Sequence, residues 1–267
     1  MTVCVGAICQ DKAAIVVASD RMVTTSMPPI EFEHTKRKIY DITNNCIALT
    51  AGNALIPIEI IPKIRAILTK TSMISQIAQN AKDIYQALRA QRAEELFMRP
   101  RAISKEIFYS RGASIFPPDL FRAIDHEFST YNFNFDILLA GIDHEAHLYG
   151  ITNPGIANCY DTISFHAIGI GYLHAVQVFI AHDYKVSYTV EEAVNIVYAA
   201  KKAAESAPGV GLETDISIIT SNGINNLGRD VIEELSKIYY EVKKTPADEM
   251  KEKSIKLKKM LEKGGQK

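Results

Sequence analysis

The chain opens with short apolar runs rich in β-branched residues, the pattern of buried strands. Polar residues interrupt them at Gln10-Asp11-Lys12 and Thr43-Asn44-Asn45, which favour turns. The polar stretch from Thr24 to Arg37, with Pro28 and Pro29, is expected to be a loop. Two hairpins are therefore predicted, from the runs Val3 to Ile8, Ala13 to Ala18, Lys38 to Ile42 and Cys46 to Ala51.

The pattern then changes to a helical period. Apolar residues recur at Ile77, Ala81, Ile84 and Leu88, which predicts an amphipathic helix over about 72–97. An earlier helix is expected from about Ile58 to Leu68, with Pro62 as a break or a start. Shorter helical pieces are expected near 104–110 and 117–128.

Strands and helices alternate once more in the second half. Thr189 and Glu192 form a capping box ahead of one helix, and Pro208-Gly209 ends it. The expected strands are Phe135 to Gly141, His147 to Thr152, Thr162 to Ile168 and Asp215 to Thr220. The expected helices are Tyr172 to His182, the capped helix, 229–242, and 246–263 with Thr245 as its cap.

This order of strands, two helices, strands, two helices and strands predicts an α+β protein. Two sheets with helix pairs outside them make a four-layer αββα sandwich, in which every apolar face is covered. We expect one domain over 1–242 with a helical insertion at 99–132, followed by a lysine-rich helical extension at 243–267. The aromatic residues of the insertion favour packing over disorder.

Composition limits the partners. The formal net charge of −1 over 267 residues gives no reason to expect binding to nucleic acid or to a membrane surface. The N-terminus lacks the basic leader of a signal peptide, and no apolar run approaches the length of a membrane span. Three of the four cysteines lie in apolar runs without metal spacing, so a cytoplasmic location is expected.

Eight short motifs follow one another in an order that resembles the β subunits of the proteasome and their simpler bacterial relatives. They are TVCVGAI (2–8), ASDRMVT (18–24), KIYDI (38–42), LTAG (49–52), ILLAGID (137–143), AIGIG (167–171), TVEEAV (189–194) and TDISII (214–219). They cover most of the chain except 99–132 and the last twenty-odd residues. The resemblance implies an N-terminal-nucleophile hydrolase fold.

An N-terminal threonine can supply both a nucleophilic hydroxyl and, as its free α-amine, the base that activates it. Thr2 meets this requirement once Met1 is removed, and a small second residue favours that removal. The resemblance implies that Lys38 lowers the hydroxyl pKa, that Asp20 pairs with Lys38, and that Asp215 fixes the N-terminal segment by hydrogen bonding.

The resemblance assigns further residues to substrate contact. Gly52 matches the glycine whose amide stabilises the oxyanion, although a strand-to-helix turn would also explain it. Thr24 and Thr50 match substrate-binding positions. Taken singly, Asp20 could end a solvated strand and Lys38 could belong to a surface basic run.

Two departures leave alternatives open. Ile170 stands where active relatives carry a serine, and it can form no side-chain hydrogen bond. The insertion at 99–132 could cap a substrate cleft or prevent ring assembly. The expected function is therefore a threonine-type peptidase or amidase. The alternatives are a non-catalytic assembly subunit and an acyl transferase or peptide ligase.

No cofactor or metal is expected. Asp143, His144, Glu145 and His147 offer possible ligands, but they lie at an expected turn between strands. Gly169 and Gly171 lack the context of a dinucleotide site. The expected partners are a peptide or amide substrate and further copies of the chain, and an unfoldase partner is left open.

Overall fold

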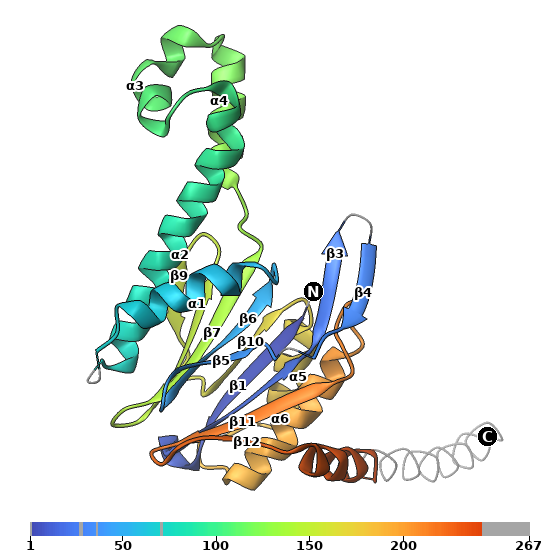
Figure 1. Ribbon diagram of the computed structural model, residues 1–267. Coiled ribbons are helices and arrows are strands. Elements are labelled where there is room, and N and C mark those ends of the chain that lie inside the picture. The colour runs from blue at the N-terminus through green and yellow to red at the C-terminus, as the bar shows by residue number, and fades with distance from the viewer. Residues whose placement is uncertain (1, 27–28, 36, 70–71, 242–267) are drawn as a thin grey trace, which may run out of the picture. The chain divides into compact units, whose positions relative to one another are not determined.

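Two five-stranded antiparallel sheets form the framework of the protein, as the computed structural model shows (Figure 1). The structure describes residues 2–26, 29–35, 37–69 and 72–241. The first sheet contains, in spatial order, β10 (Phe165–Gly169), β1 (Val3–Cys9), β2 (Ala14–Asp20), β11 (Thr214–Thr220) and β12 (Gly223–Asn226). The second contains β5 (Ile39–Thr43), β6 (Cys46–Gly52), β7 (Phe135–Ile142), β8 (Ala146–Thr152) and β9 (Ile156–Cys159).

The central position of β1 follows from its composition. All seven residues of β1 and all seven of β2 are buried, as expected for apolar strands covered on both faces. The two strands pair antiparallel, with Cys4 opposite Ser19, and η1 (Gln10–Lys12) joins them. On its other side β1 pairs with β10, where Val3 lies opposite Gly169. The N-terminal residues are therefore fixed between two neighbouring strands.

The two sheets share one hydrophobic core. Residues of β1 and β2, such as Cys4 and Val17, pack in one cluster with residues of β6 to β8, such as Leu49, Leu138 and Leu148. A second cluster lies on the opposite face of the second sheet and is completed by helices α1 (Ile56–Ala66) and α2 (Ile74–Phe97). Burial on both faces accounts for the almost continuous apolar character of β6 and β7.

Helices cover the outer faces. α5 (Tyr172–Ala181) and α6 (Val190–Ala204) pack on the first sheet, and α1 (Ile56–Ala66) and α2 (Ile74–Phe97) pack on the second. The predicted capping box is confirmed, because Thr189 and Glu192 each accept a hydrogen bond from the other's backbone N–H. Pro62 neither breaks nor starts a helix but lies inside α1, which begins with Pro57 in its first turn.

Four strands differ from the sequence-based expectation. Residues 24–37 were expected to be a loop, but β3 (Met22–Ser26) and β4 (Pro29–Glu33) pair as a two-stranded hairpin. Pro29 is compatible with this pairing because it lies at the first position of a strand. β9 and β12 are four-residue edge strands with little burial, so their sequences carry a weak apolar signal.

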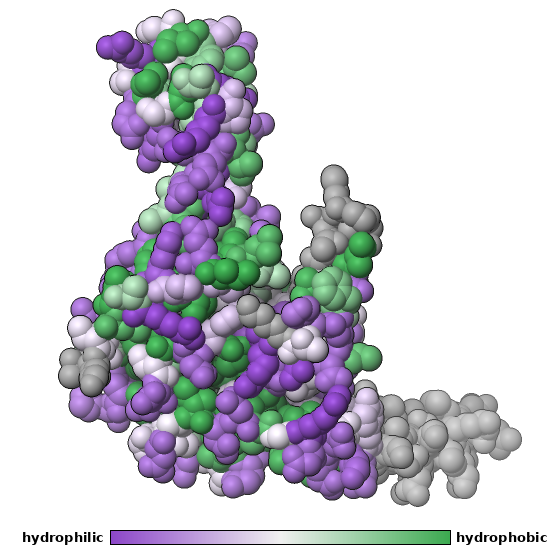
Figure 2. All heavy atoms as spheres, in the orientation of Figure 1, coloured by the Kyte–Doolittle hydropathy of each residue, from purple (hydrophilic) through white to green (hydrophobic). Residues whose placement is uncertain are grey.

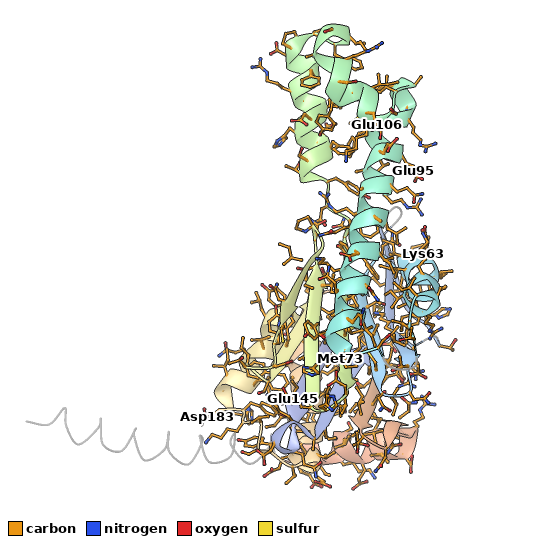
Figure 3. The ribbon with its side chains drawn as sticks, turned by 90° about the vertical axis from the view of Figure 1, so that its left-hand side faces the viewer. Lys63, Met73, Glu95, Glu106, Glu145 and Asp183 are labelled. Atoms are coloured by element: carbon orange, nitrogen blue, oxygen red, sulfur yellow. The ribbon has the colours of Figure 1, made fainter. Side chains whose placement is uncertain are left out.

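The helices of 99–132 form a small module at the far end of α2. η2 (Arg99–Arg101), α3 (Lys105–Ile115) and α4 (Pro118–Thr130) follow one another there. Figure 3 shows α2 rising from near Met73 past Glu95, with Glu106 beyond it in the module. Met98, Phe108 and Ile124 form a separate buried cluster, to which Phe116 and Phe121 add. The expectation that this segment packs is confirmed.

The compact body ends at Asn226, and residues 227–267 form a second unit. Within that unit the structure describes a helix over 229–241. The predicted helix at 246–263, its Thr245 cap and the lysine-rich extension at 243–267 lie outside the described residues. Among the described helices, none is long and apolar enough to cross a membrane.

Candidate active site

Thr2 lies in a closely packed corner at the start of β1. Only 2% of the residue is exposed, and its carbonyl accepts a hydrogen bond from Gly171 N–H at 3.5 Å. Gly169 has a φ of +88°, and a Cβ there would come within 2.3 Å of the Thr2 carbonyl oxygen. The glycines of the AIGIG segment therefore let this turn pack directly on the backbone of Thr2.

The Lys38 ammonium contacts the Thr2 side chain directly. Its Nζ donates to Thr2 Oγ1, to Asp20 Oδ1 at 2.9 Å and to the Met22 carbonyl at 2.5 Å. An ammonium carries three N–H groups, so these three acceptors satisfy it. The lysine side chain is 13% exposed, and the fully buried Asp20 carboxylate is its counter-charge.

Asp20 connects the pieces of this corner. It is fully buried, and each carboxylate oxygen accepts two hydrogen bonds. Oδ1 accepts from Lys38 Nζ and from Val3 N–H at 3.2 Å, while Oδ2 accepts from Met22 N–H at 3.2 Å and Gly211 N–H at 2.9 Å. One carboxylate thus ties together the N-terminal strand, the start of β3, the lysine and the segment before β11.

Asp215 occupies a different position from the one expected. Its carboxylate accepts from Arg21 at 2.6 and 2.9 Å and lies 3.4 Å from Arg37 Nε. β2 lies between β11 and β1, so Asp215 is two strands away, about 10 Å, from the N-terminal segment. In the described part of the chain, Asp215 therefore acts on Arg21 and Arg37 and not on the segment around Thr2.

Gly52 ends β6 beside the same corner. Its φ is +100°, and an added Cβ would meet the Asn134 carbonyl oxygen at 2.1 Å. Close contact with Asn134 is thus enough to require glycine here, whether or not the Gly52 amide contacts a substrate. Gly52 lines the cavity described next.

A cavity of about 300 Å³ opens beside Thr2 and Lys38. Its walls are largely apolar, and Tyr40 and Thr50 add hydroxyl groups that are hydrogen-bonded to each other. Figure 2 shows apolar surface near the start of α1 and on the β3–β4 hairpin. The apolar lining consists of Met22, Val23, Phe32, Ala51, Ala54, Leu55, Pro57 and Ile58.

Two of the expected residues contribute less to this geometry. Thr24 lies in β3, with its backbone opposite Glu31, and its side chain is outside what the structure describes. Ile170 follows Gly169 and is 48% exposed, so the position at which the resemblance implies a serine carries an apolar side chain open to solvent.

Asp136 is a buried carboxyl group near the site whose pKa is raised. Asp136 lies in β7 opposite Ala51, which lines the cavity. Burial raises the pKa of Asp136 to about 6. Burial also raises the pKa of the Tyr40 phenol, which the hydrogen bond from Thr50 partly offsets, so Tyr40 stays neutral near pH 7.

A possible metal-binding group lies at the other end of the second sheet. Ligand atoms of Glu145, His147 and Asp161 lie within 4.8 Å of one another. Each already has a partner, however: His147 bonds Asp161 at 2.6 Å and Asp143 at 3.2 Å, while Glu145 pairs with Lys12 at 3.0 Å. These contacts join strands and turns, and they account for the cluster without an ion.

Three parts of the site escape a reading of the sequence. The Met22 carbonyl and the Gly211 amide are backbone groups, so the residue types at these positions do not indicate their role. Lys201 lies behind Gly211, and it had a detectable signal: it occupies the apolar stripe that includes Val194, Val197 and Ala204. A lysine on a buried helix face needs specific partners.

No protein-family model matches the sequence, and no curated protein matches it.

Proposed function

We propose that the protein is a threonine-type N-terminal-nucleophile hydrolase of the proteasome-like class, acting on amide bonds. The proposal includes a four-layer αββα arrangement of the helices and sheets. The observation that carries it is the Lys38 ammonium between Thr2 Oγ1, Asp20 and the Met22 carbonyl. A positive charge held at a hydroxyl favours its deprotonated form, which is the attacking species.

The reaction proceeds through an ester. Thr2 Oγ attacks the amide carbonyl while its proton passes to the Thr2 α-amine. The carbon–nitrogen bond then breaks, and the departing amine takes that proton. Water attacks the resulting ester in the same manner and releases the acid. The Gly52 amide is the proposed donor to the oxyanion.

The mechanism requires a free α-amine on Thr2. Met1 therefore has to be removed, and Met1 lies outside the described residues. Arg37, which lines the cavity, shares the Asp215 carboxylate with Arg21.

The cavity indicates the class of substrate. Its apolar walls favour an acyl group that carries an aliphatic or aromatic side chain, since burial of such a group contributes about 1.5–3 kcal/mol. Thr50, at its floor, is the proposed contact with that group. A short peptide amide with a leucine next to the scissile bond is the substrate to test first.

The test compares three proteins after N-terminal sequencing has shown which residue is first. Thr2→Ala removes the nucleophile and should abolish cleavage of a leucine-containing fluorogenic peptide amide. Thr220→Ala alters a threonine at the far end of β11 and should retain cleavage. Equal activity in Thr2→Ala and the starting protein would refute the mechanism. Cleavage in the presence of glycinamide distinguishes hydrolysis from transfer, because a transferase releases the glycinamide adduct.

A non-catalytic assembly subunit is the second candidate. Ile170 favours it, because an exposed isoleucine supplies no proton path beside Thr2. A retained Met1 would support this candidate, which predicts no cleavage and no covalent labelling of Thr2 by a peptide vinyl sulfone.

Self-association and a cytoplasmic location belong to the same proposal. Leu173 and Ile180 on α5 are 63% and 59% exposed, and they lie on one side of the helix. Such a face is suited to contact with another copy of the chain. Light scattering coupled to size-exclusion chromatography measures the number of copies, with Leu173→Ser and Ile180→Ser expected to reduce it.

A further inference from the structure

Lys201 is a buried lysine outside the cavity that holds a backbone segment of the candidate site. It lies in α6 with no exposed surface. Its ammonium donates to Glu205 Oε1 at 2.6 Å, to the Gly211 carbonyl at 2.9 Å and to the Leu212 carbonyl at 2.8 Å. These three bonds use all three N–H groups. Two of them fix backbone that is not part of any helix or strand.

The same backbone is held from its other side by Glu33, the last residue of β4. Glu33 Oε1 accepts from Leu212 N–H at 2.5 Å and from Glu213 N–H at 3.0 Å. Two successive peptide groups therefore lie between the Lys201 ammonium, bound to their carbonyls, and the Glu33 carboxylate, bound to their N–H groups. Opposite charges at the two ends of a peptide dipole strengthen both hydrogen bonds.

The held segment reaches the reacting corner through Gly211. Its N–H donates to Asp20 Oδ2 at 2.9 Å, and Asp20 binds Lys38 with its other oxygen. A Cβ on Gly211 would lie 2.6 Å from Glu33 Oε1 and 3.0 Å from both Met22 N and Met22 Cβ. The segment thus packs closely against Met22, whose carbonyl is an acceptor for Lys38.

We propose that Lys201 is a positioning residue for the Thr2 site. It braces residues 211–213 so that the Gly211 amide holds Asp20, and Asp20 in turn holds the Lys38 ammonium at Thr2. Lys201 itself touches neither the cavity nor the reacting atoms. The role in catalysis rests on the proposed function, whereas the brace itself is a property of the fold.

Lys201→Met tests the brace because methionine keeps the unbranched apolar stem and removes the ammonium. Lys202→Met is the matched control: Lys202 also binds Glu205, at 2.9 Å, but the bonds to Gly211 and Leu212 come from Lys201. Hydrogen exchange reports on the brace without any activity. We expect exchange at the Gly211, Met22 and Val3 amides to rise about tenfold or more in Lys201→Met, while amides of β7 and β8 stay unchanged.

Labelling of Thr2 by a peptide vinyl sulfone reports on the chemical step. In Lys201→Met the maximal labelling rate should fall about tenfold, with the half-saturating probe concentration changed far less, since the cavity walls remain. A residue that only stabilises the fold would lower the melting temperature and leave the maximal rate of the folded protein unchanged.

The outcomes separate the two proposals. Absence of labelling in the starting protein overturns the proposed function. Hydrogen exchange at the Gly211, Met22 and Val3 amides then still shows whether Lys201 braces residues 211–213. Unchanged exchange at the three amides in Lys201→Met overturns the brace, whatever the labelling shows. If Lys201→Met does not fold, Gly211→Ala replaces it, because its Cβ displaces Glu33 and Met22 and should produce the same local exchange and slower labelling.

Discussion

Two glycines have similar backbone φ angles but differ in how closely other atoms surround them. Substitutions at the two positions therefore distinguish the cost of backbone strain from the cost of steric contact. Gly52 and Gly223 have φ values of +100° and +115°, a region that costs other residues about 1–2 kcal/mol. A Cβ at Gly52 would also meet the Asn134 carbonyl oxygen at 2.1 Å, whereas at Gly223 the nearest described atom is 3.6 Å away.

Gly52→Ala should therefore destabilise the protein by more than Gly223→Ala does. We expect a loss of about 3 kcal/mol or more for Gly52→Ala and about 1 kcal/mol for Gly223→Ala. Urea unfolding of both variants measures the difference. Equal losses would mean that the backbone at Gly52 moves away from Asn134 without cost.

Asp136 makes stability depend on pH. Its pKa rises from an ordinary 3.8 to about 6 on folding because the carboxyl group is buried. The unfolded chain loses this proton first as the pH rises, so folding is favoured below pH 4 and that advantage is lost by the time the pH passes 6. Above pH 6 the buried charge costs up to about 3 kcal/mol.

Asp136→Asn should raise the melting temperature at pH 8 and have much less effect at pH 4. His166 complicates the unmodified protein, because burial lowers its pKa to about 4 and so disfavours folding in acid. Comparing each variant with its parent at the same pH removes that contribution. A stabilisation that is the same at both pH values would contradict the assignment to Asp136.

At the residue scale, the sequence could suggest the side chains of the site but not the backbone that positions them. Thr2, Asp20 and Lys38 come together as the resemblance implies, since each has a distinctive type at a matched position. Asp215 does not join them, because β2 lies between its strand and β1. A short sequence motif does not reveal the order of the strands in the sheet. Gly211 enters through its amide, which any residue type would carry.

Among the elements, the α3–α4 module has its own core. Phe108 is fully buried there, stacked on Phe121 with ring centroids 4.6 Å apart. The cluster shares no member with the two clusters of the sheets. A small core with separate contacts is expected to open without the rest of the molecule.

Phe108→Ala should unfold the module and leave the sheets intact. Loss of a buried phenylalanine costs about 3–5 kcal/mol, and Phe108 is one of the three buried residues of this cluster. Hydrogen exchange should reach the unprotected rate in α3 and α4 and stay slow in β6 and β7. Ile107→Ala provides the control, because Ile107 is 43% exposed in the same helix. Equal loss of protection in the sheets would contradict an independent module.

At this scale the sequence predicted elements with a strong apolar period and missed those without one. α2 and α6 repeat buried positions over several turns, so they were predicted nearly to their ends. The β3–β4 hairpin was missed because prolines and charges dominate its sequence, while its pairing is made by backbone groups.

At the scale of the whole molecule, side chains of the two sheets pack against each other in one shared core. Leu148 is fully buried in β8, and a Cβ on Gly6 of β1 would lie 2.9 Å from its Cδ1. Because these residues of different sheets are in such close contact, the stability of one sheet is expected to depend on the stability of the other.

Leu148→Ala should destabilise both sheets together by about 2–5 kcal/mol. Exchange in β1 and β2 should accelerate as much as exchange in β6 and β7, in contrast to Phe108→Ala. Acceleration confined to the second sheet would show that the sheets unfold separately.

The place of β1 also has a consequence for how the protein is made. β1 is an inner strand, and one of its two neighbours, β10, comes more than 150 residues later in the chain, at Phe165–Gly169. During synthesis, the edge of β1 that pairs with β10 stays unpaired until residues 165–169 have left the ribosome. An enzyme that removes Met1 needs an extended and accessible N-terminus, and β1 is accessible while this edge is unpaired. The proposed maturation at Thr2 would have this interval of synthesis in which to occur before the sheet closes.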